Sequence, residues 1–122
     1  MPSEFVKEVA DVFAKDGPLS KVTANYTPRP SQIEFATSVA EALEKGKTLV
    51  AEAGTGTGKT FAYLVPALLK DQKVLISTAG KTLQDQLFTK DIPALLKALG
   101  MGCRVALLKG RSNYICKQRL EH

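Results

Sequence analysis

The sequence is poor in the residues that small secreted domains and metal-binding domains depend on. Its 122 residues include two cysteines, Cys103 and Cys116, and one histidine. Two cysteines are too few for a disulfide framework, so we expect a reducing compartment. The single histidine, His122, completes a Leu-Glu-His ending that is typical of the junction to an affinity tag. We therefore leave residues 121–122 out of functional interpretation and expect an engineered fragment.

Long hydrophobic runs are also missing. The longest, such as residues 64–69, are far shorter than the roughly 20 apolar residues that a membrane-spanning helix needs. The first residues do not combine a basic region with an apolar stretch, as a signal peptide would. We therefore expect a cytoplasmic protein with no membrane partner.

The composition is that of an ordinary globular domain. The chain is 44% hydrophobic and 24% charged, and its length is typical of one domain with its own core. The net charge of +5 favours a polyanionic partner such as nucleic acid, although a basic soluble domain without such a partner would look the same.

Apolar runs of strand length alternate with segments of helical periodicity. This alternation predicts an α/β fold, in which helices flank a mainly parallel sheet. The helix near residue 31 begins with a capping box in which Ser31 is the N-cap and Glu34 bonds back to it, and Pro66 should kink or shorten its helix. Strands are expected at 48–51, 73–77 and 103–108, and helices at 3–14, 31–46, 58–69, 82–88, 92–99 and 113–120.

A glycine-rich loop lies between the first expected strand and the helix that follows it. Three glycines allow successive backbone N–H groups to point inward and hold phosphates together with the helix N-terminus. A lysine then reaches the β- and γ-phosphates, and the next hydroxyl binds Mg²⁺. The loop reads Ala53, Gly54, Thr55, Gly56, Thr57, Gly58, Lys59, Thr60, and it predicts that the chain binds a nucleoside triphosphate with magnesium.

The acidic partner that hydrolysis requires is absent. P-loop hydrolases hold Mg²⁺ with a second acidic group that follows another strand. Here the later strands are expected to end at Ser77-Thr78 and at Lys109-Gly110, and neither end offers an aspartate. We therefore expect the chain alone to bind nucleotide weakly and to hydrolyse it poorly or not at all.

Four segments together resemble the DinG/YoaA-type helicases, relatives of the repair helicase XPD in superfamily 2. They are residues 26–32, 52–60, 76–87 and 107–116, and the likeness covers about 16–120. It implies the N-terminal part of the first RecA-like motor lobe of an ATP-dependent 5′-to-3′ DNA helicase acting in repair or replication. The implied divisions are a helix and connector (1–30), the partial ATP-binding lobe (31–109) and the start of an iron–sulfur insert (110–120).

The resemblance also implies roles for single residues. Arg29 and Gln32 match a motif whose glutamine contacts adenine, although Gln32 on sequence grounds alone also fits a helix-start residue facing water. A second set would touch single-stranded or forked DNA: Ser77, Thr78, Gln84, Lys109, Arg111 and Tyr114. The alternative for the first three is simple helix capping, by Thr78 or Thr82, and the alternative for the last three is a solvated basic loop.

Cys116 matches the first of four cysteines that hold a 4Fe–4S cluster in the resembled family. A cluster of this kind needs four thiolates, so it belongs to the full-length protein only. Cys103 matches no ligand position, and its place in an apolar strand predicts a buried side chain.

Two other functional classes stay open. A small P-loop phosphotransferase would share the loop and the chain length, although we find no arginine-rich lid or acidic substrate residue. A non-enzymatic module that binds single-stranded nucleic acid would use the basic surface with a degenerate nucleotide site. For each reading we expect a monomer.

Overall fold

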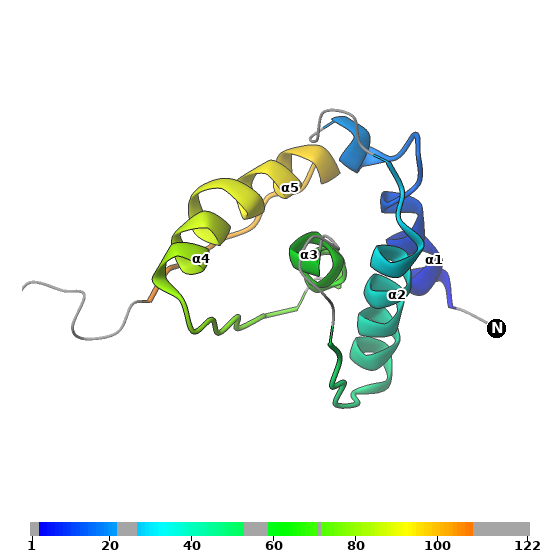
Figure 1. Ribbon diagram of the computed structural model, residues 1–122, viewed down its shortest axis with the longest axis horizontal. Coiled ribbons are helices and arrows are strands. Elements are labelled where there is room, and N and C mark those ends of the chain that lie inside the picture. The colour runs from blue at the N-terminus through cyan, green and yellow to red at the C-terminus, as the bar shows by residue number, and fades with distance from the viewer. Residues whose placement is uncertain (1–2, 22–26, 53–58, 71, 109–122) are drawn as a thin grey trace, which may run out of the picture.

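The computed structural model describes residues 3–21, 27–52, 59–70 and 72–108. In the view of Figure 1, α3 lies between α2 and the run formed by α4, η2 and α5. The elements are α1 (Glu4–Val12), the 3-10 turn η1 (Pro18–Lys21), α2 (Pro30–Lys45), α3 (Lys59–Leu69), α4 (Lys81–Gln86), the π-helical turn η2 (Leu87–Asp91) and α5 (Ile92–Leu99).

The first expected helix is confirmed as α1. Ser3 is its N-cap, and the Ser3 Oγ accepts a hydrogen bond from the Val6 N–H at 3.2 Å. Val6, Val9 and Val12 share one buried face, as the apolar periodicity predicts. The helix ends at Val12, two residues before the expected boundary.

A tight turn after α1 depends on Gly17. The Gly17 N–H donates to the Ala14 carbonyl at 2.9 Å. A Cβ atom at position 17 would lie 2.6 Å from the Asp11 carbonyl oxygen and 2.8 Å from that of Val12. These contacts are with backbone, which cannot rotate away as a side chain would, so only glycine fits here.

Helix α2 begins one residue earlier than the sequence predicted. Its N-cap is Arg29, in an extended conformation, and Pro30 occupies the first turn. The predicted capping box is therefore wrong: Ser31 lies inside the helix, because proline with its fixed φ is well suited to the first helical position. The C-terminal end is as expected, with Gly46 in the left-handed conformation at φ +64°.

Helix α3 continues past its proline. Pro66 is fully buried and α3 extends to Leu69, so the expected early end is wrong. The next turn is still closed by a hydrogen bond from the Lys70 N–H to the Pro66 carbonyl at 3.1 Å.

The two helices expected at 82–88 and 92–99 form one continuous helical run, from α4 through η2 to α5. Its middle is a π-turn in which the Ile92 N–H bonds to the Leu87 carbonyl. Pro93 follows at once and has no N–H to donate to Thr89, which gives a physical reason for the wider turn. Gly100, at φ +67°, ends the run as predicted.

The core takes residues from α1, α2, α3, η2 and α5, but none from α4. Its fully buried members include Val9 and Phe13 from the first helical segment, Leu64 from α3 and Leu95 from α5. Helix α2 packs against both α1 and α3, and α5 contacts η1. Within the described ranges no helix is long and apolar enough to cross a bilayer.

The predicted parallel sheet is not confirmed. Across the described residues the structure contains no strand: segments 47–52, 73–78 and 101–108 are extended but unpaired. Apolar side chains on these segments are accordingly exposed to solvent: Val50 is 93% exposed and Leu75 is 94% exposed. A parallel sheet is normally buried on both faces by helices, and these segments lack that cover. The helix expected at 113–120 lies outside the described residues.

The Gly17 turn gives a first prediction. Gly17→Ala should destabilise the fold by about 1–3 kcal/mol, the usual cost of overpacking, because the new methyl group meets two backbone carbonyls. Gly102→Ala is the matched control, since nothing lies within 4 Å of its added methyl group. Urea unfolding followed by circular dichroism measures both, and equal midpoints for the two variants would contradict the turn's packing.

Candidate functional site

The N-terminus of α3 carries the two residues of the glycine-rich motif that the structure describes. Lys59 is the first helical residue and is exposed, and Thr60 follows in the same turn, half-buried. The first N–H groups of a helix have no partner within it, and the helix dipole favours an anion at this end. This end therefore suits a phosphate chain. Loop residues 53–58 lie outside the described residues.

Thr60 takes part in a small polar cluster that joins α3 to η2. Burial raises the pKa of the Tyr63 hydroxyl, while a hydrogen bond from the Thr60 side chain lowers it and the negative charge of Asp91 raises it. Burial also raises the pKa of Asp91, against a hydrogen bond from Gln86 and the positive charge of Lys90.

Gln32 is buried, with only 6% of its surface exposed. The interpretation of this residue as a helix-start side chain facing water is therefore wrong. Gln32, Ala36 and Ala40 recur every four residues and form one buried stripe along α2. Arg29, the other predicted adenine contact, is exposed at the start of the same helix.

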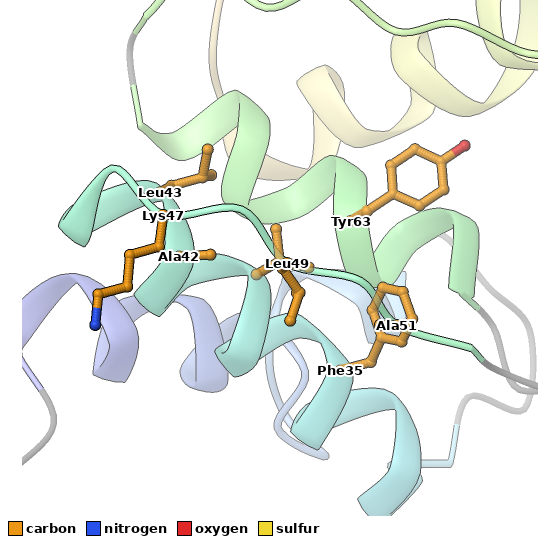
Figure 2. A pocket seen from close by; sticks show the side chains of 8 residues that line it. Phe35, Ala42, Leu43, Lys47, Leu49, Ala51 and Tyr63 are labelled. Carbon is orange, nitrogen blue, oxygen red and sulfur yellow. The ribbon is translucent and has the colours of Figure 1, made fainter.

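An apolar hollow of about 310 Å³ lies beside the start of the glycine-rich loop. Figure 2 shows that its side chains come from α2, the segment 47–51 and α3, with the Tyr63 hydroxyl pointing away from Leu43 and Lys47. Lys47 is its single charged residue. Apart from Lys47 and Tyr63 the lining side chains are apolar. These two side chains are too few donors for a triphosphate, so we do not assign the nucleotide to this hollow.

A larger groove, of about 930 Å³, brings together three predicted nucleic-acid contacts. Ser77 and Thr78 end one extended segment, Gln84 lies on α4, and all three line this groove, which we call the α4 groove. The segment 101–108 forms another part of its wall, and Figure 1 shows it running back along the α4–η2–α5 helices. The sequence did not indicate that this segment would lie so close to α4.

The α4 groove also has charged residues that the sequence interpretation missed. Lys73, Lys81 and Arg104 line it, and every charged residue in the lining is a cation. Lys73 and Arg104 lie at the start of predicted strands, and Lys81 directly precedes a predicted helix, so cations at the ends of apolar segments were the available signal. A groove with cations and no carboxylates is suited to a polyanion.

Helix capping does not account for the hydroxyl residues near α4. The N-cap of α4 is Gly80, with no side-chain capping bond. The Thr78 hydroxyl instead lies 3.4 Å from the Gly80 carbonyl oxygen, a long contact. The capping alternative for Thr78 and Thr82 is therefore wrong, and a role for Thr78 in binding stays a prediction.

A family model gives the classification of the chain. The model for DEAD/DEAH box helicases matches residues 32–122, which is most of the sequence. The chain belongs to the DEAD/DEAH box helicase family. This membership implies the P-loop NTPase fold.

Individual relatives agree with the family. The chain is 56% identical over 113 residues to the ATP-dependent DNA helicase YoaA of Escherichia coli, and 49% identical over 118 residues to that of Haemophilus influenzae. It is 46% identical over 104 residues to the ATP-dependent helicase DinG of Mycobacterium tuberculosis. These matches cover 93%, 97% and 79% of the chain but only 16–18% of the relatives. No solved structure matched.

The cysteines of this helicase-family chain do not fit an iron–sulfur cluster by themselves. Cys103 is exposed and free, so the predicted burial of its side chain is wrong, because the expected strand does not pair. Among the described residues no group of three or more histidine, cysteine or acidic side chains could hold a metal. Cys116 lies outside the described residues, as do Lys109, Arg111 and Tyr114.

Asp91 gives a prediction for the dependence of stability on pH. Its folded pKa is raised, so the native state binds its proton more tightly than the unfolded chain does. The stabilising contribution of this proton is complete below the unfolded pKa and disappears as the pH rises through the folded pKa. Asp91→Asn should therefore raise the unfolding temperature at neutral pH slightly. It should also remove the part of the pH dependence of stability that comes from this carboxyl group at acid pH.

Thermal unfolding between pH 3 and pH 7 measures this effect. Asp85→Asn, on the exposed surface of α4, serves as the comparison, since it makes the same chemical change at a solvent-exposed carboxyl group. A loss of neutral-pH stability on Asp91→Asn would show that the carboxylate is stabilising and would contradict the prediction.

Proposed function

We propose that this chain is the ATP-binding N-terminal part of the first motor lobe of an ATP-dependent 5′-to-3′ DNA helicase of the DinG/YoaA type. The proposal rests chiefly on α3, which packs against α2 and begins at the lysine of the glycine-rich motif. The names of the relatives, which are ATP-dependent helicases, support the helicase activity. The chain spans less than a fifth of their length, which supports its being one part of a longer protein. The complete protein would act in DNA repair or replication, as a cytoplasmic monomer.

In the proposed nucleotide site, the backbone of residues 53–58 and the start of α3 surround the phosphates. Lys59 contacts the β- and γ-phosphates and Thr60 binds Mg²⁺. Arg29 and Gln32 contact the adenine, for which an amide is suited because it both donates and accepts hydrogen bonds. The burial of Gln32 means that adenine would have to reach a side chain held within the α2 packing surface.

The proposed lobe contains a mainly parallel sheet built on the three extended segments. Each exposes an apolar side chain, such as Val50, Leu75 or Leu108, and none is paired within the described residues. Unpaired backbone with apolar side chains is a template for strand addition. The proposed divisions remain residues 1–30, 31–109 and 110–120.

The proposed DNA path follows the α4 groove toward the residues beyond Leu108. Ser77, Thr78 and Gln84 lie in the groove, and its charged residues are cations. Lys109, Arg111 and Tyr114 would add phosphate contacts and base stacking, which suits single-stranded or forked DNA. The same groove supports the alternative of a non-enzymatic nucleic-acid-binding module.

Hydrolysis and cluster binding are proposed for the full-length protein only. Neither of the two later expected strands is followed by an acidic residue that could complete the Mg²⁺ site, and the two cysteines cannot supply four thiolates. Cys116 would be the first ligand of a 4Fe–4S cluster there. By itself the chain should bind nucleotide weakly.

A titration with Mg-ATP tests the nucleotide site. Backbone amide shifts from Gly54 to Thr60 should change at millimolar ligand, because the phosphates replace water at the loop and at the start of α3. Lys59→Ala should weaken binding by roughly tenfold or more, as expected for loss of a charge-assisted contact.

Lys47→Ala is the control, since Lys47 lines the apolar hollow and not the start of α3. Unchanged amide shifts at every loop position would refute the nucleotide site. Transfer of the γ-phosphate to small hydroxyl compounds would favour the phosphotransferase alternative.

A further inference from the structure

Phe88 is an aromatic residue that the core does not use. It is half-buried on η2, and it is not among the half-buried residues that pack against the described core. The half-buried phenylalanines of other helices, Phe5, Phe35 and Phe61, all pack against that core. Phe88 lines the α4 groove instead, where it is the one aromatic residue in the described lining. Core packing therefore does not account for this ring.

Two walls of the α4 groove meet one helical turn before Phe88. The Gln84 Nε2 donates to the Leu108 carbonyl at 2.9 Å, so the end of the segment 101–108 lies beside α4. Gln84 and Phe88 both line the groove, and helical residues four positions apart lie on one face. Phe88 is therefore on the side of the helical run that the segment 101–108 approaches.

Cations stand on three different elements of the same groove. Lys73 lies on one extended segment, Lys81 is the first residue of α4, and Arg104 lies on the segment 101–108. All three are exposed, and the described lining contains no carboxylate. Proteins that bind single strands combine cations, which contact the phosphates, with aromatic rings on which bases stack. The α4 groove has both kinds of side chain.

We propose that the α4 groove binds single-stranded DNA by stacking a base on the Phe88 ring, while Lys73, Lys81 and Arg104 contact phosphates. This inference rests on the proposed function and adds a base contact to the phosphate contacts predicted there. Bases inside a duplex cover each other's faces, so an unpaired base is needed to stack on a protein ring. Every base has a π-face, so the groove should prefer single strands without selecting a sequence.

An acidic polypeptide is the other polyanion that a groove lined by cations could hold. Phe88 favours the nucleic acid, because a run of glutamates has the charge but no flat face to cover the ring. Hydroxyl groups such as those of Ser77 and Thr78, which also line the groove, are common partners of phosphate oxygens.

Two probes of equal length and charge test the stacking. One is oligo-dT, and the other has the same sugar–phosphate backbone without bases. In fluorescence anisotropy at low salt, the chain should bind oligo-dT about five- to hundredfold more tightly, the range expected for one stacked base. Phe88→Leu should remove this difference by weakening only the binding of oligo-dT. Phe88→Tyr keeps a ring and should preserve the difference to within about twofold.

Phe5→Leu is the matched control, because Phe5 is also half-buried but lies on α1, outside the groove lining. It should leave both affinities unchanged. Arg104→Gln should weaken both probes by the same factor, since it removes a phosphate contact. Because Phe88 does not pack against the described core, Phe88→Leu should keep the circular dichroism spectrum of the wild-type chain.

A measurement on the wild-type chain decides the matter even if Phe88→Leu does not fold. The ring-proton resonances of Phe88 should move upfield when oligo-dA binds, because a stacked purine shields them. They should stay in place when the abasic probe binds. Unmoved ring resonances at saturating oligo-dA would overturn the stacking.

Equal affinities of the wild-type chain for oligo-dT and the abasic probe would show that phosphate contacts alone hold the strand, and would overturn the role of Phe88. A chain that binds neither probe would overturn DNA binding in the groove. Displacement of oligo-dT by an equal charge of poly-glutamate would assign the groove to acidic polypeptides and would overturn the inference as well. None of these results bears on the nucleotide site, which the Mg-ATP titration tests by itself.

Discussion

The packing of α2 against α3 is the contact on which the rest of the structure depends. Both helices present alanines to the core: Ala36 and Ala40 on α2, and Ala62 on α3, are all fully buried. Small side chains allow two helices to approach closely, and the larger core residues then fill the space around them. Helix α1 covers the other side of α2, and α5 reaches the same core through η1.

This packing connects the two halves of the proposed nucleotide site. Gln32 lies on the buried stripe of α2 together with Ala36 and Ala40, while Lys59 and Thr60 begin the partner helix. The residues predicted to contact adenine and those predicted to contact phosphates are therefore held by one interface. The α4 groove lies on a different part of the molecule, where cations and hydroxyl groups line its wall.

Helices and their ends were predictable from local patterns. The valine periodicity of α1, and the glycines at positions 46 and 100, indicate helix faces and ends through nearest-neighbour geometry alone. The interpretation around two prolines was wrong. Pro30 lies in the first turn of α2, one residue before the predicted start, and Pro93 follows the widened turn of a run that we predicted as two separate helices. A proline fits equally well at a helix start and next to a widened turn.

Long-range contacts were not predictable from the sequence. Strand pairing depends on partners elsewhere, so the apolar runs around Val50 and Leu75 indicated strands that the structure leaves unpaired. The burial of Gln32 and the bond from Gln84 to Leu108 likewise depend on how helices pack. For the site, the sequence indicated candidate phosphate-binding residues, which stay a prediction, but it did not indicate the groove cations Lys73, Lys81 and Arg104.

The most direct test compares the dissociation constants of Mg-ATP and magnesium tripolyphosphate by calorimetry. If the α2–α3 interface holds the adenine contact beside the phosphate site, ATP should bind several times more tightly than tripolyphosphate. That difference should disappear in Gln32→Met, which keeps the side-chain volume. Equal dissociation constants for the wild-type chain would contradict this account and would leave Gln32 as a buried packing residue.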